Sequence, residues 1–190
     1  HLSLEETVGV ETEANRTSQE TIYTTAIIPE LEYAINNLPE TQSEYGRATK
    51  GAAQFLLSKV YLTYGWLTGK TENFNKSIEM AEAVIGNANY SLLSDYADLW
   101  DINNQKNNEV IWSVQNSTDP LTRGTGNRSH LFFLMGYDKL PGMKRTIEYG
   151  RPYIRFAPTP YALSLWDRKY DARYYKSYQH VWYANNTANL

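Results

Sequence analysis

The stretch that decides the fold is residues 46–85, GRATKGAAQFLLSKVYLTYGWLTGKTENFNKSIEMAEAVI. Its apolar residues recur at helical spacing in two runs, separated by a polar break after Gly69. The first run is Ala53, Leu56, Leu57, Val60, Tyr64 and Leu67, and the second is Phe74, Ile78, Ala81 and Ile85. Two amphipathic helices joined by so short a loop must pack antiparallel, because each apolar stripe needs a partner. The stretch therefore predicts a helical hairpin of the size of a tetratricopeptide unit.

Shorter elements are expected on both sides of this hairpin. Thr17-x-x-Glu20 is a capping-box pattern, and apolar residues follow it at helical spacing up to residue 38. Pro29 lies inside this segment, so the helix either kinks there or begins anew with Pro29 in its first turn. Residues 109–114 alternate and are β-branched, which predicts a short strand, and a capped helix is expected over residues 161–166. The predicted fold class is mainly α, with tetratricopeptide-like hairpins, one short strand and a loop-rich, aromatic-rich excursion.

Composition and charge limit the classes of protein to which the chain can belong. The chain has 190 residues and no cysteine, which excludes disulfides, thiolate metal sites and cysteine nucleophiles. Residues 1–50 carry nine acidic and three basic side chains, whereas residues 120–190 carry four acidic and eleven basic ones. The C-terminal third is thus a basic region on an acidic body. No apolar run approaches the roughly 20 residues of a membrane span. Without a signal peptide or an initiator Met, the chain is expected to be a piece of a longer protein.

Catalytic and metal-binding patterns are missing from the sequence. There are three His residues, and no Gly-x-Ser-x-Gly, His-Glu-x-x-His or Walker pattern occurs. Asp101-x-Asn103-x-Gln105 resembles the start of a calcium loop, but Lys106 replaces the glycine required at the sixth position. A glycosidase needs two carboxylates without fixed spacing, yet most acidic residues fall on expected helix surfaces or in the acidic lead-in. We predict a protein that is not an enzyme and needs neither a metal nor another cofactor.

Aromatic residues concentrate after residue 130, where fourteen of the 26 lie, together with seven of the nine Arg between Arg123 and Arg173. Such a region can stack on sugar rings, stack on nucleobases, or simply pack a loop-rich subdomain. A pI near 5.7 disfavours nucleic acid. Packing suits the aromatic residues at helical spacing, and the Asp171-x-Arg173 pattern predicts a buried ion pair. Packing is also the expected role of Trp66, Trp100 and Trp112.

An ordered series of motifs resembles the SusD/RagB-like family across about residues 18–183. The motifs are GRATKGAA at 46–53, VYL at 60–62, NNEVIWSV at 107–114, YGRPYIRFAPT at 149–159 and Asp171-x-Arg173-Tyr174. The resemblance implies a lipoprotein on the extracellular face of the Bacteroidetes outer membrane, built on tetratricopeptide-like helix pairs. It also implies glycan capture beside a SusC-like TonB-dependent transporter in nutrient uptake, with a lipid anchor outside this chain.

The binding residues are predicted from loop position, because the family's glycan contacts lie on variable loops. Ligand-binding residues concentrate on loops, which selects Phe132, Tyr137, Tyr149, Arg151 and Tyr153 in the irregular part of the chain. The aromatic residues would stack on sugars and Arg151 would contact hydroxyls. We expect one SusD-like domain over 1–190, with a helical-repeat part at 18–115 and a loop-rich ligand-binding part at 116–190. Two alternatives remain, a RagB-like component that binds peptides and a helical-repeat scaffold for partner proteins.

Overall fold

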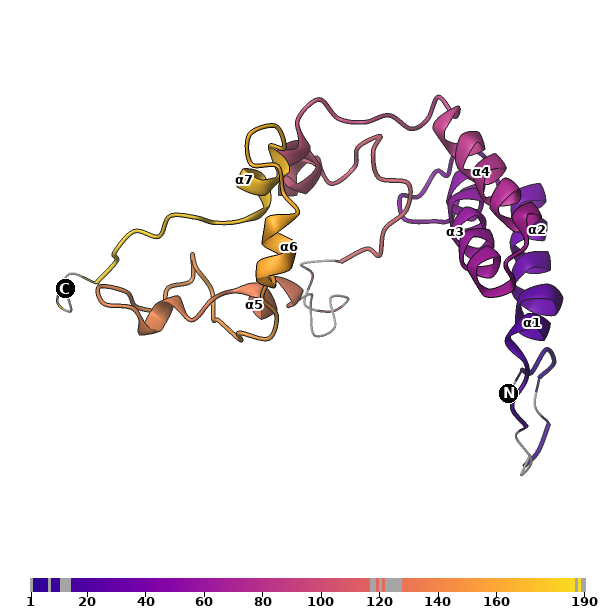
Figure 1. Cartoon of the computed structure of the whole chain (residues 1–190), viewed down its shortest axis with the longest axis horizontal. Coiled ribbons are helices and arrows are strands. Elements are labelled where there is room, and N and C mark those ends of the chain that lie inside the picture. Colours follow the sequence, from indigo (N-terminus) through magenta and orange to yellow (C-terminus); the bar gives the residue numbers. More distant parts are fainter. Residues whose placement is uncertain are drawn as a thin grey trace. The chain divides into compact units, whose positions relative to one another are not determined.

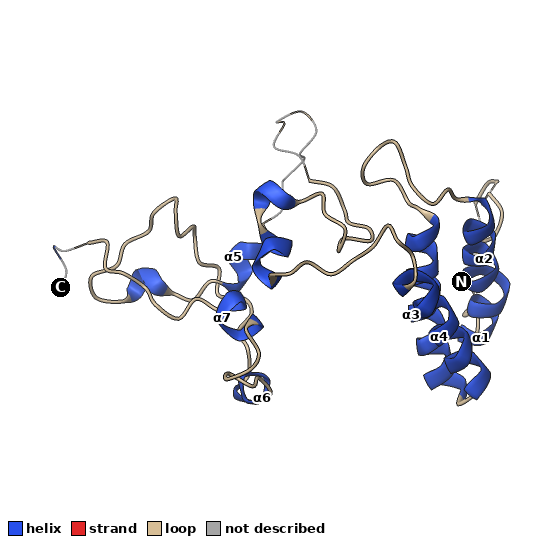
Figure 2. Cartoon of the chain, turned by 90° about the horizontal axis from the view of Figure 1, so that it is seen from above, coloured by secondary structure: helices blue, strands red, loops and turns tan. Residues whose placement is uncertain are grey.

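The computed structural model describes residues 2–6, 8–10, 15–116, 119, 121, 128–186 and 188 (Figures 1 and 2). The chain divides into two compact units. Unit 1 comprises His1–Ser94 and Ile102–Val114, and unit 2 comprises Asp95–Asp101 and Gln115–Leu190. The regular elements of the described residues are helices, which confirms the mainly α fold class. No described helix combines the length and the apolar character of a membrane span.

Unit 1 begins with a helical column in three parts, α1 (Gln19–Ile22), the π-helical turn η1 (Tyr23–Ile27) and α2 (Ile28–Asn37). Its N-cap is Ser18, one residue later than the pattern predicts, and the Ser18 hydroxyl accepts from Thr21 N–H at 3.1 Å. Pro29 lies in the first turn of α2, as the second alternative required. The π-helical turn before it keeps the chain helical where a proline would otherwise clash with the preceding turn.

The predicted hairpin is confirmed as α3 (Lys50–Thr68) and α4 (Thr71–Ile85), which pack against each other, with α3 also packing against α2 (Figure 1). Thr49 caps α3 by accepting from Ala52 N–H at 3.2 Å. Gly69 ends α3 with φ +69°, a left-handed conformation that glycine adopts without a Cβ clash. Its N–H donates to Gly65 O at 2.8 Å, which closes the last turn of α3. Helix α4 starts two residues after Gly69 and runs back along α3.

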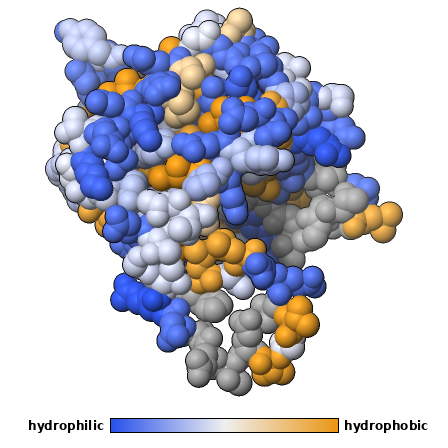
Figure 3. Space-filling view, turned by 90° about the vertical axis from the view of Figure 1, so that its right-hand side faces the viewer, coloured by the Kyte–Doolittle hydropathy of each residue, from blue (hydrophilic) through white to orange (hydrophobic). Residues whose placement is uncertain are grey.

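The buried face of the hairpin differs from the predicted stripes. Leu56 and Leu67 are about half exposed, and Ile85 is 80% exposed. The residues that are buried on α3 are Gly51, Ala52, Ala53, Leu57, Tyr61, Tyr64 and Gly65. Because α3 packs against two helices, its buried positions spread around the helix and include small residues and tyrosines. Apolar side chains therefore also reach the surface, as Figure 3 shows for the side of the molecule nearest these helices.

Two further expectations for this unit are wrong. Residues 109–114 form no strand, because no described segment pairs with them in a ladder. Trp112 there donates its indole N–H to Gly46 O at 2.8 Å and stays 57% exposed. Trp66 is likewise 77% exposed, so neither ring is a packing residue of the kind predicted.

Unit 2 consists of short helical turns joined by long loops. They are η2 (Tyr96–Trp100), α5 (Ser129–Phe133), η4 (Tyr137–Lys139), α6 (Pro160–Ser164) and α7 (Arg173–Ser177), whereas η3 (Ile102–Asn104) belongs to unit 1. Thr159 caps α6 by accepting from Ala162 N–H at 3.1 Å, in agreement with the predicted helix start. Helix α7 packs on η2, and the two are joined by an ion pair of 3.0 Å between Lys176 Nζ and Asp95 Oδ2.

Two side-chain expectations in unit 2 are also corrected. Asp171 and Arg173 do pair, at 2.6 Å between Oδ2 and Nη2, but Arg173 is 57% exposed and the pair is not buried. Hydrogen bonding from Arg173 holds the pKa of the Asp171 carboxyl below its usual value. Trp100 is 69% exposed, so it is not the inward packing residue that its position in a helical turn indicated.

Candidate ligand-binding site

The five predicted site residues fall into two neighbouring groups in unit 2. In the first group, the rings of Phe132 and Tyr153 lie 5.7 Å apart, and the Arg151 guanidinium lies 5.7 Å from the Tyr153 ring. In the second group, the rings of Tyr137 and Tyr149 meet edge to face at 5.4 Å. The Tyr137 hydroxyl donates to the carbonyl of Gly150, the residue between the two groups.

Backbone hydrogen bonds tie the loop that carries this sequence to α5. Tyr153 N–H donates to Leu131 O at 3.0 Å, and Arg155 N–H donates to Phe132 O at 2.9 Å. Gly150 has φ +72°, and a Cβ there would lie 3.0 Å from Leu131 Cδ2. Glycine therefore permits both the turn and the close approach of this loop to α5.

Tyr137 is fully buried, with 0% of its surface exposed. Its ring stacks on Trp182 with centroids 5.1 Å apart and an interplanar angle of 13°. Tyr149 packs against the same Trp182 at 5.2 Å, edge to face. With one face on an indole and its hydroxyl bonded to Gly150, Tyr137 has no face left for a ligand and instead supports Trp182.

A cavity of about 470 Å³ lies directly in front of these groups. We call it the aromatic cavity. Its lining includes four aromatic rings and three polar side chains, namely Phe133, Phe156, Tyr178 and Trp182 with His130, Ser177 and Gln179. Phe133 and Phe156 are 66% and 57% exposed, and their rings contact each other with centroids 5.4 Å apart. Of the described residues that line it, none is Asp, Glu, Lys or Arg.

Three of the five predicted residues contact rings that line this cavity. Phe132 contacts Phe156 edge to face at 6.2 Å, while Tyr137 and Tyr149 back Trp182. The predicted residues thus lie in the same unit as the cavity, whereas the cavity lining contains other aromatic residues, namely Phe133, Phe156, Tyr178 and Trp182. The criterion of an irregular backbone also applies to Phe156 and Trp182, so that signal was present in the sequence.

The segment that carries Trp182 is held by the loop at residues 142–144. The N–H groups of Asn185 and Asn186 both donate to Gly142 O at 3.0 Å. Lys144 N–H donates to Asn185 Oδ1 at 2.8 Å, and Asn185 Nδ2 returns a bond to Lys144 O at 3.0 Å. These four bonds bring the C-terminal segment back against the loops after α5, which places Trp182 at the cavity wall.

Three of the described cations of unit 2 are engaged with aromatic faces or carboxylates. The Arg168 guanidinium lies 4.6 Å from the Tyr174 ring, and that of Arg173 lies 5.3 Å from the Trp166 ring. Arg145 pairs with Asp138. Among the described residues, no group of three or more His, Asp or Glu is placed to hold a metal ion. The cavity itself therefore presents aromatic faces and uncharged polar groups.

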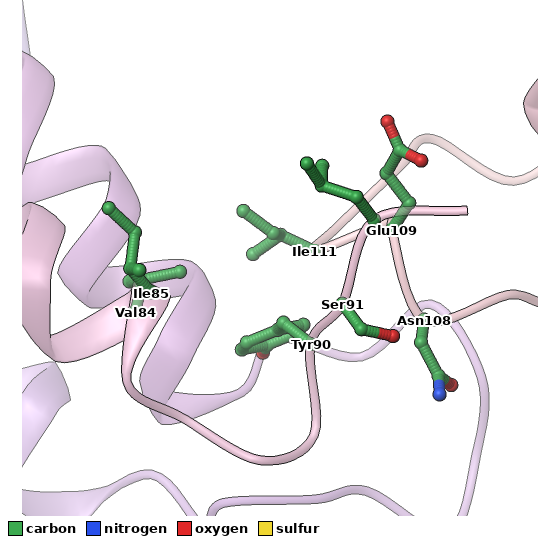
Figure 4. Close-up of a pocket in the computed structure, with 8 residues that line it drawn as sticks. Val84, Ile85, Tyr90, Ser91, Asn108, Glu109 and Ile111 are labelled. Atoms are coloured by element: carbon green, nitrogen blue, oxygen red, sulfur yellow. The ribbon is translucent and has the colours of Figure 1, made fainter. Parts of the chain in front are cut away.

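Unit 1 has a cavity of a different character, about 400 Å³ in volume (Figure 4). Its apolar lining comes from Val84, Ile85, Tyr90, Leu92 and Ile111. The polar groups beside it are used within the fold, since Leu93 N–H donates to the Glu109 carboxylate at 2.8 Å and Ser91 N–H donates to Asn108 O at 3.1 Å. The described lining also includes Ser91, Asn108 and Glu109, of which the Glu109 carboxylate is engaged by the Leu93 N–H.

Parts of the chain are similar in sequence to three known proteins. Over 93 residues, 47% of the chain, it is 39% identical to a SusD-like protein of Bacteroides ovatus. Over 106 residues, 55% of the chain, it is 30% identical to SusD-like protein P25 of Formosa agariphila. Over 73 residues, 38% of the chain, it is 36% identical to the starch-binding protein SusD of Bacteroides thetaiotaomicron.

The matches span 17%, 19% and 13% of the lengths of these three relatives. No family model matches the chain, and no solved structure matches it significantly. The resemblance indicated by the sequence motifs is nevertheless confirmed by three relatives of one kind: over about half of its length, this chain is homologous to SusD-like proteins.

Proposed function

We propose that this chain belongs to the glycan-binding component of a nutrient-uptake complex and that the aromatic cavity of unit 2 holds the glycan. The observation that carries this proposal is the cavity lining, in which Phe156 and Trp182 present ring faces beside the polar Gln179 and His130. Aromatic rings pack on the C–H faces of sugars, while amide and imidazole groups bond to hydroxyls. The name of one relative, a starch-binding protein, supports the same class of ligand.

The charge of the cavity favours a neutral glycan over an acidic peptide. Binding a carboxylate would require a cation, and the described lining residues include no Lys or Arg. Two basic side chains of unit 2 are engaged elsewhere, since Arg173 pairs with Asp171 and Arg168 lies on the Tyr174 ring. The predicted role of Arg151 in hydroxyl contacts stays a proposal for the rim, where its exposed guanidinium lies against Tyr153.

The same lining supports binding rather than hydrolysis. A glycosidase places two carboxyl groups on either side of the scissile bond, and the described residues around the aromatic cavity supply no Asp or Glu. We therefore propose a non-enzymatic protein that captures a glycan and releases it to a SusC-like TonB-dependent transporter at the extracellular face of the outer membrane. The transporter and this location rest on the family resemblance.

Isothermal calorimetry tests the proposal. The chain would be titrated with maltoheptaose, cellohexaose, xylohexaose, mannohexaose and a mixed oligopeptide preparation. We expect saturable binding of at least one glycan, and expect Phe156→Ala and Trp182→Ala each to weaken it by about 1–3 kcal/mol, the order found for one stacked ring. Tyr161→Ala is the matched control, because Tyr161 is 73% exposed and lies outside the cavity lining.

The possible results separate the alternatives. Peptide binding without glycan binding would favour the RagB-like alternative. An absence of saturable binding to any of these compounds would favour the scaffold. Glycan binding that survives both Phe156→Ala and Trp182→Ala would remove the aromatic cavity from the site.

A further inference from the structure

A second cavity opens beside the aromatic cavity, again within unit 2. It has a volume of about 420 Å³ and is lined by Tyr96, Ala97, Trp100, Asp101, Lys176 and Ser177. Its walls come from η2 on one side and the C-terminal end of α7 on the other, which are two elements in direct contact. We call it the η2 cavity.

The two cavities are adjacent because they share a residue. Ser177, at the end of α7, lines the η2 cavity with Lys176 on its N-terminal side, and lines the aromatic cavity with Tyr178 on its C-terminal side. The chain turns from helix to extended backbone at Tyr178, with φ −119° and ψ 131°. Side chains around this turn therefore reach into both cavities, and the exposed Ser177 lies on the rim between them.

The η2 cavity resembles the aromatic cavity in its exposed aromatic lining, but its described lining also includes the charged residues Asp101 and Lys176. Trp100 is 69% exposed and is held edge to face against Tyr96, with ring centroids 6.0 Å apart. The only ammonium among the described lining residues belongs to Lys176, and Asp95 pairs with it at 3.0 Å. This cation is thus already neutralised. An open indole face beside polar groups suits a second sugar ring, and a charged ligand is not required.

We propose that the η2 cavity is a second sugar subsite, and that the chain binds an oligosaccharide that runs from Trp182 across Ser177 to Trp100. The inference rests on the proposed glycan binding and adds the size of the ligand. A glycan too short to reach both cavities gains binding free energy from one set of rings, whereas a longer glycan gains it from both sets. Affinity should therefore rise with chain length until both cavities are filled.

A length series tests this inference. Maltose to maltoheptaose, with the matching cello- and xylo-oligosaccharides, would be titrated into the unaltered chain and the Trp100→Ala variant. In the series that binds, we expect Trp100→Ala to weaken the longest members about 5- to 150-fold, the range for one stacked ring. Binding of the shortest bound member should change less than twofold. Trp182→Ala should weaken every member.

Two controls keep the outcomes distinct. Trp100 is largely exposed, so an unchanged circular dichroism spectrum is expected for its variant, and Tyr170→Ala removes an aromatic ring that is 76% exposed and lies outside both cavities. Equal loss for short and long members, or no loss with Trp100→Ala, would overturn the second subsite while leaving glycan binding in place. Failure of every glycan to bind would overturn the proposed function, and the second subsite with it.

Discussion

Asn185 bonds to both backbone polar groups of Lys144. The Lys144 N–H donates to Asn185 Oδ1 at 2.8 Å, and Asn185 Nδ2 donates to Lys144 O at 3.0 Å. One side chain thereby imitates the paired bonds that a neighbouring strand would make. The relationship matters for the site because Trp182, three residues before Asn185, depends on this segment for its position at the cavity wall.

Replacement of Asn185 by Ala removes both bonds, so that the N–H and C=O groups of Lys144 can bond only to water. We expect a loss of about 1–2 kcal/mol in the stability of unit 2, at the usual net value of one to two hydrogen bonds. Glycan affinity should also fall, although Asn185 does not line the aromatic cavity. Urea unfolding and calorimetry measure the two effects. Asn186→Ala is the control, because Asn186 bonds to Gly142 through its backbone N–H; an equal loss in both variants would contradict the role of the Asn185 side chain.

Tyr137→Phe tests the supporting role of a buried ring. The variant keeps the stacking on Trp182 but loses the bond from the hydroxyl to Gly150 O. We expect a destabilisation of about 1–2 kcal/mol, since a partly buried carbonyl loses its partner, and little change in glycan affinity. Tyr137→Ala should cost about 3–5 kcal/mol by opening a cavity and should weaken binding through Trp182.

Tyr161→Phe is the matched control in this comparison, because Tyr161 is exposed. If Tyr137→Ala left both the melting temperature and the affinity unchanged, Tyr137 would not support the cavity wall. If Tyr137→Phe abolished binding in a folded protein, its hydroxyl would have a more direct role than the structure indicates.

The sequence predicts the hairpin well because local signals agree there. Helical periodicity and Gly69 at the turn both act over short distances, and they locate the break between α3 and α4 closely. The buried face was harder to predict, because α3 packs on two helices. Apolar periodicity alone does not show how many helices pack against a segment. Trp66 and Leu67 therefore look like core residues in the sequence but lie exposed in the structure.

The candidate site was only partly predictable for a related reason. The loop criterion selected residues of unit 2, but which ring faces a cavity depends on contacts between distant segments. Trp182 stacks on Tyr137 in a segment that Asn185 ties to Lys144, 41 residues earlier in the chain. The expected strand at residues 109–114 failed likewise, since a strand needs a partner and its own residues cannot supply one.

Gly65→Ala tests the close packing of the hairpin. Alanine normally stabilises a helix relative to glycine by about 0.5–1 kcal/mol, but a Cβ at this position would lie 2.8 Å from Phe74 Cε1. The Phe74 ring is itself held edge to face by Trp66 at 5.7 Å, so it cannot shift without loss of that contact. We expect a net destabilisation of about 1–3 kcal/mol, the usual effect of overpacking.

A double-mutant cycle isolates this clash. In the Phe74→Ala background the ring is absent, and Gly65→Ala should become neutral or stabilising by its helix propensity. Thermal or urea unfolding of the four proteins gives the coupling between the two positions. Equal effects of Gly65→Ala in both backgrounds would show that the two residues do not press on each other.

The contact between α2 and α3 predicts an alkaline limit to stability. The buried Tyr61 hydroxyl donates to Glu32 Oε1 at 2.9 Å, and burial first, then the bond to Glu32, raises the pKa of Tyr61 above its usual value of 10.0. Below pH 10 the phenol is protonated in both states. Above it the unfolded chain releases the proton first, so the unfolded state binds fewer protons and the free energy of unfolding falls as the pH rises.

Urea unfolding at pH 8, 9, 10 and 11 measures this dependence. We expect Tyr61→Phe to be less stable than the unaltered chain by about 1 kcal/mol at pH 8, because the bond to Glu32 is lost. We also expect its stability to fall less steeply above pH 10, because the group that titrates is gone. Tyr33→Phe is the control, since Tyr33 is 70% exposed. Parallel pH profiles for the unaltered chain and Tyr61→Phe would show that Tyr61 ionises as readily in the folded protein as in the unfolded one.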